Sequence, residues 1–422
     1  MFLSKYSYVF DYDESCNVIF QSHSKKVIVV PKRFFIKRSL ELHNFSAETR
    51  DFMLKNYFVF TSEEDEKAYA VKKIKEQRQL LENELSVVIE TTNHCNISCS
   101  FCYQKGWAKS SREISPDTLL QLNAIISAFV RVKQIEVINL SIIGGEPLLN
   151  KSFITFYGEL KKLCSLQGIK IKTKINTNGI LLTPSFVNMF DDINIIVPLN
   201  SKKEYGKLIR PNDNKTDIYN KVISNIKLCA DLFNFHRQLI IRYNTNQDNI
   251  YDFEDFVKEL SALEIPNMII IPEYLFNVGS GTFTNKLNRS DFVEWSQTKA
   301  LYILRKFGFP LPYKLQQGMN ICKGMGEFTF KVYADGRFSL CNGDSYEISL
   351  PSLNSIDSIF EISALLHDKK VFDSKCLCCR KIFVCPNIAP CRRGEDCDAD
   401  SYEFENYIRT LVKFKRSTNG SV

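Results

Sequence analysis

The chain has 422 residues, of which 44% are hydrophobic and 24% charged, and this composition and length predict an ordinary globular protein of two or three domains. No apolar run approaches the roughly 18 residues that span a bilayer, and the first residues have no signal-peptide core, so we expect a cytoplasmic protein without a membrane partner. The modest net charge of +7 is typical of an ordinary solvated surface, with a mild attraction for an acidic peptide as the alternative interpretation. A nucleic-acid partner is not expected, because the sequence has no concentrated basic run.

Residues 1–82 are predicted to form a small α+β module. Runs rich in Val, Ile and aromatic residues predict short strands, at Tyr6–Phe10, Asn17–Gln21, Lys26–Pro31 and Phe58–Phe60. A helix is expected over Ala47–Tyr57. A second helix is expected to begin after Thr61 and Ser62, where acidic residues follow a capping hydroxyl, and to reach about Leu81.

From residue 83 to about residue 300, apolar strands alternate with helical segments. The strands are expected at Leu85–Glu90, Glu136–Ile143, Ile169–Asn176, Ile193–Leu199, Gln238–Tyr243 and Met268–Ile271. Strands that are joined by helical crossovers form a parallel sheet. Six such units do not readily close an eight-stranded barrel, so the sequence predicts an α/β fold with an open, partial (β/α)6 barrel.

A loop with three cysteines follows the first of these strands. Cys95, Cys99 and Cys102 stand three and then two residues apart. A [4Fe–4S] cluster is normally closed by four thiolates, so three of them leave one iron open to a small molecule. The segment Gly144-Gly145-Glu146-Pro147 follows the second strand and is therefore expected at the same rim of the sheet. A structural zinc site that uses His94 as fourth ligand remains an alternative.

This cysteine spacing, with Phe101 just before the third cysteine, resembles the signature of the radical SAM enzymes, and Gly144–Pro147 matches the GGEP motif of that family. The resemblance implies that S-adenosylmethionine (SAM) binds the open iron and is cleaved reductively to methionine and a 5′-deoxyadenosyl radical. It also implies that Gly144, Gly145 and Glu146 lie at the SAM amino group. Arg210 stands where relatives often keep an arginine near the SAM carboxylate, and Asn176–Gly179 resembles a segment that shapes the rim.

Residues 301–422 are rich in cysteine, with eight between Cys322 and Cys397. Their spacing resembles the SPASM domain, an extension of radical SAM enzymes that act on peptides and proteins. The resemblance implies two auxiliary [4Fe–4S] clusters, one held by Cys322, Cys341 and Cys391, the other by Cys376, Cys379, Cys385 and Cys397. Cys378 is an extra cysteine that could replace Cys376 or Cys379, and a zinc ribbon remains an alternative for the whole group.

The resemblance therefore implies a peptide maturase that forms a thioether or carbon–carbon crosslink in a ribosomally made precursor peptide. By its position and its order of elements, the module at 1–82 resembles a winged-helix peptide-recognition module that would bind that precursor; a structural lead-in to the barrel is the alternative. A flavodoxin- or ferredoxin-type protein is the expected electron donor. Two alternatives stay open. One is an anaerobic sulfatase-maturing, formylglycine-generating enzyme; its relatives tend to have Asp where this chain has Asn342, although Asp344 is nearby. The other is a noncatalytic iron–sulfur electron carrier.

Overall fold

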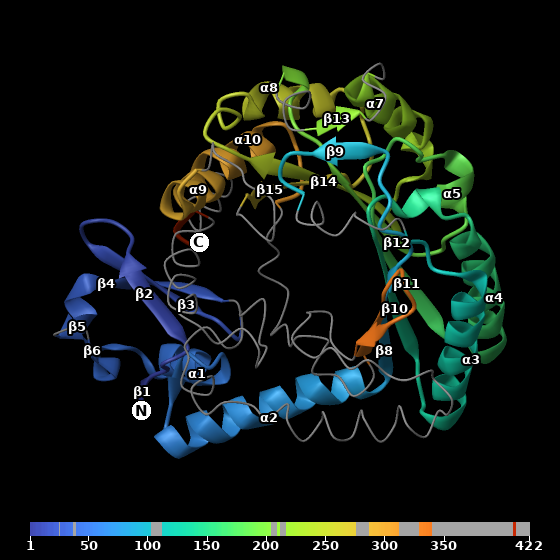
Figure 1. Cartoon of the computed structure of the whole chain (residues 1–422). Coiled ribbons are helices and arrows are strands. Elements are labelled where there is room, and N and C mark those ends of the chain that lie inside the picture. Colours follow the sequence, from blue (N-terminus) through green and yellow to red (C-terminus); the bar gives the residue numbers. More distant parts are fainter. Residues whose placement is uncertain are drawn as a thin grey trace. The chain divides into compact units, whose positions relative to one another are not determined.

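Figure 1 shows a computed structural model of the chain. The structure describes residues 1–24, 26–36, 39–102, 112–203, 209–211, 217–275, 287–311, 329–339 and 408–410. The chain divides into two compact units, of which one comprises Met1–Leu81, Tyr313–Met325 and Leu365–Val422 and the other Glu82–Pro312 and Gly326–Ala364. Among the helices of the described residues, none combines the length and the apolar character that crossing a membrane requires.

The first unit contains a three-stranded antiparallel sheet, in the order β2 (Ser7–Asp11), β3 (Cys16–Gln21) and β4 (Val27–Pro31). Strand β7 (Val59–Phe60) pairs with β1 (Phe2–Leu3), and β5 (Phe35–Ile36) pairs with β6 (Ser39–Leu40). The helices are α1 (Ala47–Lys55) and α2 (Glu63–Glu82). The strands β2, β3, β4 and β7 and both helices lie where the sequence predicts them, whereas β1, β5 and β6 were not predicted. The likeness to a winged-helix recognition module stays a prediction.

Local capping and apolar packing explain these elements. The Ser46 hydroxyl accepts a hydrogen bond from the Thr49 amide at the start of α1. At the start of α2 the Ser62 hydroxyl accepts one from the Asp65 amide, as the acidic run after Ser62 predicts. Six buried apolar side chains then form one core. They are Ile19, Val30, Leu40, Met53, Phe58 and Val59.

The second unit is built on an eight-stranded sheet in the order β15-β14-β12-β11-β10-β8-β16-β17. Its strands are β8 (Glu84–Glu90), β10 (Val137–Ile143), β11 (Lys170–Asn176), β12 (Ile193–Pro198), β14 (Arg237–Thr245), β15 (Ile269–Tyr274), β16 (Thr329–Val332) and β17 (Phe338–Ser339). The six strands from β8 to β15 correspond to the six predicted from the sequence, and all of their neighbouring pairs are parallel. The prediction of a parallel sheet with helical crossovers is confirmed.

The sequence analysis did not predict β16. This strand pairs in parallel with β8, and β17 folds back on it as an antiparallel partner. Strand β16 lies within residues 301–422 and has only four residues, which is too short a pattern to predict a strand. The Phe330 side chain stacks on Phe129 at a ring distance of 5.9 Å and so ties β16 to the helix α3 (Pro116–Val132).

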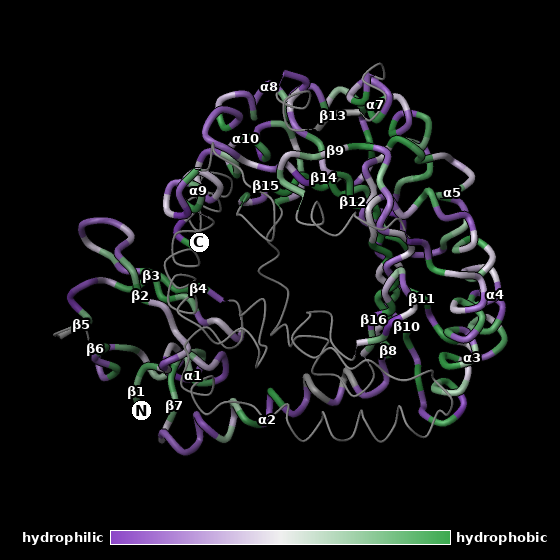
Figure 2. The backbone as a smooth tube through the Cα atoms, in the orientation of Figure 1, coloured by the Kyte–Doolittle hydropathy of each residue, from purple (hydrophilic) through white to green (hydrophobic). Residues whose placement is uncertain are grey.

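Helices cover the convex side of the curved sheet, as Figure 1 shows for α3, α4 (Ser152–Gln167), α5 (Pro184–Asn188), α7 (Ile218–Leu228) and α8 (Phe253–Ser261). Alternate strand residues face these helices and are fully buried, for example Ile138 and Ile142 of β10. The hydrophobic colour along β12 in Figure 2 reflects the same packing. The residues in between face the concave side, where Asn139 and Ser141 are only partly buried.

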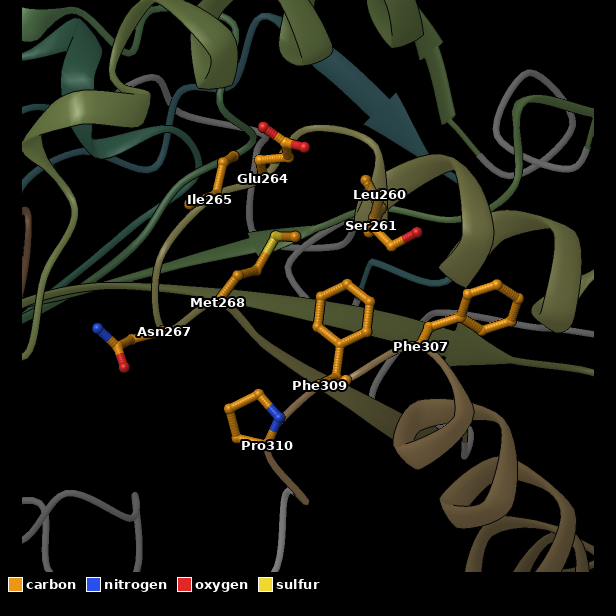
Figure 3. Close-up of a pocket in the computed structure, with 10 residues that line it drawn as sticks. Leu260, Ser261, Glu264, Ile265, Asn267, Met268, Phe307, Phe309 and Pro310 are labelled. Carbon is orange, nitrogen blue, oxygen red and sulfur yellow. The ribbon is translucent and has the colours of Figure 1, made fainter.

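A cavity of about 250 Å³ lies at the amino end of β15 (Figure 3). It is formed by the turn between α8 and β15, where Glu264 and Asn267 have left-handed backbone angles, and by the segment after α10 (Leu301–Lys306). This end of the sheet is opposite to the carboxyl ends of the strands. Because ligands of such folds bind at the carboxyl ends, the cavity is separate from the candidate site.

Candidate functional site

The cysteine loop leaves the carboxyl end of β8 and forms one side of the candidate site. Its short strand β9 (Ile97–Cys99) pairs in antiparallel fashion with β13 (Ile209–Pro211), and the Cys102 amide donates a hydrogen bond to the Cys99 carbonyl at 3.3 Å. Cys95, Cys99 and Cys102 are all partly exposed. The three cysteines therefore lie at the rim of the sheet, where the order of the strands predicts them.

The backbone of Gly144 and Gly145 lies directly against this loop. The Gly145 amide donates to the Thr92 carbonyl at 2.8 Å, and the Glu146 amide donates to the His94 carbonyl at 2.7 Å. A Cβ atom on Gly144 would lie 2.4 Å from the Thr92 oxygen, and one on Gly145 would lie 2.1 Å from the His94 oxygen. Only glycine allows so close an approach. The two glycines of the motif thus let two loops at the rim pack backbone to backbone.

Glu146 is fully buried, and its carboxylate accepts three hydrogen bonds from the protein. One oxygen accepts from the Leu148 amide at 3.0 Å and from the Thr177 hydroxyl at 2.7 Å, and the other accepts from the Asn178 amide at 2.7 Å. Burial raises the pKa of Glu146, and the three hydrogen bonds oppose that shift. The carboxylate connects the loop after β10 to the loop after β11. Its position beside the SAM amino group stays a prediction.

Asn178 extends this connection to the cysteine loop. Its side-chain NH₂ donates to the Asn96 side-chain oxygen at 2.7 Å and lies 3.9 Å from the Cys95 sulfur. Its own oxygen accepts from the Ile180 amide at 3.0 Å, which fixes the direction of the NH₂ group. The sequence marked Asn176–Gly179 as a rim segment but did not single out Asn178. The feature of the sequence that could have indicated Asn178 is its position just after the third parallel strand, at the rim where the cysteine loop lies.

The environment of Cys95 has opposing effects on its thiol. Burial is the largest cause of its raised pKa, and the charges of Glu146 and Cys102 raise it further. Hydrogen bonds from the Ile97 amide and from Asn178 act in the opposite direction. The raised pKa means that the protein alone favours the neutral thiol of Cys95. Because iron binds the thiolate, the positive charge of the bound iron would have to stabilise that anion.

The donor set fits three ligands of an iron–sulfur cluster. Among the described residues, no three His, Cys, Asp or Glu side chains are grouped closely enough to hold a single metal ion. A [4Fe–4S] cluster does not require such a grouping, because each thiolate binds a different iron. Three partly exposed thiols on one loop, with an amide NH₂ beside one of them, match the needs of a cluster better than those of zinc.

Other predicted site residues are described in part. The Arg210 backbone pairs with Ser98 in the middle of the cysteine loop, which brings its main chain to the rim. Phe101 is partly exposed and next to Cys102. Cys322, Cys341, Cys376, Cys378, Cys379, Cys385, Cys391 and Cys397 lie outside the described residues, and so do Asn342 and Asp344. The auxiliary clusters therefore stay a prediction.

Comparison with known proteins shows what the region that carries this site is similar to. Residues 89–260 match the Radical SAM superfamily. A probable GTP 3′,8-cyclase of Pyrococcus horikoshii is 23% identical over 176 residues, which are 42% of this chain and 53% of the cyclase. This chain thus spans about half the length of that relative. A cysteine-type anaerobic sulfatase-maturating enzyme of Clostridium novyi is 25% identical over 339 residues, which are 74% of this chain and 89% of that enzyme.

Solved structures agree on the fold. The structure of native anSMEcpe with bound AdoMet and Kp18Cys peptide superposes with a TM-score of 0.56 at 16% sequence identity, over 79% of this chain and 99% of that chain. The likeness therefore extends well beyond residues 89–260.

Proposed function

We propose that this chain is a radical SAM enzyme that modifies a polypeptide substrate, because residues 89–260 match the Radical SAM superfamily. The domain implies SAM and one [4Fe–4S] cluster as cofactors. The observation that carries the proposal is the connected rim, in which Gly145 and Glu146 bind the backbone of the cysteine loop while Asn178 binds Asn96 and approaches Cys95. When bound, the cluster supplies the electron that cleaves SAM.

In this proposal each part of the rim has a separate task. Cys95, Cys99 and Cys102 hold three irons and leave the fourth open. Gly144 and Gly145 pack their loop against the backbone of Thr92 and His94, so that it would line the SAM site beside the cysteine loop. The buried Glu146 holds Thr177 and Asn178 in place. Because these contacts link the loops of the rim to one another, they would hold the site in one arrangement for SAM.

A polypeptide substrate is supported by the relatives that cover most of this chain. The sulfatase-maturating enzyme aligns over 89% of its own length, and the anSMEcpe structure contains a peptide. The cysteine-rich region at residues 301–422 points the same way through its likeness to the SPASM extension. We propose two auxiliary clusters there, leader binding by residues 1–82, and a flavodoxin- or ferredoxin-type electron donor. The proposed product is a thioether or carbon–carbon crosslink in a precursor peptide.

Formylglycine formation on a sulfatase is the second candidate, because two of the compared proteins relate to sulfatase maturation. Against it stands Asn342, where sulfatase-maturing relatives tend to have an aspartate; an amide does not accept a proton from the substrate at neutral pH. Asp344, two residues farther on, is the carboxylate that this candidate would need to use.

One experiment separates the candidates. The full chain is reconstituted anaerobically and incubated with SAM and dithionite, together with one of three probes: a short precursor peptide encoded beside the gene, a cysteine-containing sulfatase peptide, or GTP. We expect 5′-deoxyadenosine release and, by mass spectrometry, a precursor peptide that has lost two hydrogen atoms. An aldehyde on the sulfatase peptide would establish the second candidate. Consumption of GTP, with both peptides unchanged, would contradict a polypeptide substrate.

A further inference from the structure

Strand β11 places three lysines on the concave face of the sheet. We call these residues, Lys170, Lys172 and Lys174, the lysine row. All three are exposed, whereas Thr173 and Ile175, which alternate with them along the strand, are buried. The pairing register puts the lysine row beside Val137, Asn139 and Ser141 of β10, on the face that the helices do not cover. Within the described part of the chain, none of the three lysine side chains forms an ion pair or a hydrogen bond.

The lysine row leads towards the candidate site. Strand β11 continues from Lys174 to Asn176, and the next two residues, Thr177 and Asn178, bind Glu146 and the cysteine loop. Lysines two residues apart on one strand are separated by about 6.6 Å, so the lysine row spans about 13 Å. It forms a linear set of charges that starts at the amino end of the strand and runs towards the rim.

Lys174 has charged neighbours from two other strands. Desolvation is the largest cause of its lowered pKa, the charge of Arg242 on β14 lowers it further, and Glu273 on β15 opposes the shift. The Arg242 Nε lies 3.6 Å from a Glu273 carboxylate oxygen. Lys174 is thus exposed on a concave wall and lies within the field of the Arg242 and Glu273 charges. A cation in that setting interacts more strongly with an incoming carboxylate than one on a convex surface.

We propose that the lysine row binds acidic side chains of the polypeptide substrate while that segment is extended along the concave face. The inference rests on the proposed function and adds the chemical class of the substrate. In an extended peptide, alternate side chains point the same way at intervals of about 6.6–6.8 Å, which matches the spacing of the lysines. A nucleoside triphosphate is a compact anion and needs donors that converge on one point, whereas these three lysines are arranged in a line.

The test measures equilibrium binding of fluorescently labelled octapeptides to the anaerobically reconstituted full chain at low salt. The probes are an alternating Glu-Ser peptide and an alternating Gln-Ser peptide, with GTP as competitor. We expect the Glu-Ser peptide to bind more tightly and to be released as salt screens the charges. The triple variant Lys170→Gln, Lys172→Gln, Lys174→Gln should lose about tenfold in affinity, because three exposed ion pairs to the peptide are removed together.

The matched control removes three exposed lysines from the outer helices, by Lys162→Gln, Lys227→Gln and Lys258→Gln, and changes net charge equally. It should bind the Glu-Ser peptide like the unaltered chain. A single reversal, Lys172→Glu, which leaves the buried face of β11 untouched, should abolish the preference for Glu-Ser over Gln-Ser. Circular dichroism and the fluorescence of the buried Trp295 verify folding of each variant.

Equal losses in the two triple variants would overturn the proposal, because they would show a general effect of net charge. An absence of preference for the Glu-Ser peptide in the unaltered chain would overturn it as well. Complete displacement by GTP at a concentration far below that of the peptide would assign the lysine row to a nucleotide instead. SAM cleavage by the unaltered chain is measured separately, so a failure of the proposed function is distinguishable from a failure of this inference.

Discussion

Replacing Glu146 by alanine should destabilise the second unit strongly. The substitution leaves two buried donors, the Thr177 hydroxyl and the Asn178 amide, and one partly buried donor, the Leu148 amide, without an acceptor. Each orphaned donor costs about 1–3 kcal/mol. Because the three share one neighbourhood and partly relax together, we expect a loss of about 3–5 kcal/mol rather than the full sum. Glu146→Gln keeps one acceptor oxygen and should cost about 1–3 kcal/mol, since its NH₂ group then faces the Asn178 amide.

The assay is urea unfolding followed by the fluorescence of Trp295, which is buried in the second unit against Phe253 and Phe292. Glu259→Ala, an exposed position on α8, is the matched control and should stay within about 0.5 kcal/mol of the unaltered chain. A loss below about 1 kcal/mol for Glu146→Ala would refute the reasoning, because the carboxylate would then not connect the two loops. Equal losses for alanine and glutamine would refute the assignment of separate donors to its two oxygens.

Three further predictions concern the cysteines and Asn178. Burial raises the pKa of Cys164 and Cys229 from 9.0 to about 11. At pH 8 the fraction of each that is thiolate is therefore about 100-fold lower than for an unburied cysteine, and it rises only as the pH approaches that pKa. Iodoacetamide should therefore label the partly exposed Cys16 and spare both; labelling at equal rates would be inconsistent with this burial. Asn178→Ala removes the NH₂ group near Cys95 and should lower the reduction potential of the cluster, as measured by potentiometric EPR; an unchanged potential would exclude such a hydrogen bond. The reconstituted full chain should carry about twelve irons, and about four would exclude the auxiliary clusters.

The sequence predicts the sheet well because each of its strands is a local pattern. Leu85–Glu90 and Glu136–Ile143 are apolar runs bounded by helical segments, and both appear as parallel strands, β8 and β10. Their carboxyl ends then place the cysteine loop and the GGEP segment on one rim. No long-range information is needed for this step, because strand direction alone decides it.

The connections within the site depend on register and on three-dimensional packing. The approach of Gly145 to the His94 carbonyl and the hydrogen bond from Asn178 to Asn96 join segments 51 and 82 residues apart, and no sequence pattern relates them. Glu146 was predicted from its motif, but its three bonds inside the protein were not. The strand β16 was missed because four residues give too short a pattern to detect.

Release of 5′-deoxyadenosine from SAM under dithionite tests the central claim most directly. The triple variant Cys95→Ala, Cys99→Ala, Cys102→Ala is compared with the unaltered chain and with Cys16→Ala, which removes a partly exposed cysteine of the other unit. The account predicts that the unaltered chain and Cys16→Ala release 5′-deoxyadenosine alike, and that the triple variant releases none while it still binds iron. Undiminished release by the triple variant would contradict the account.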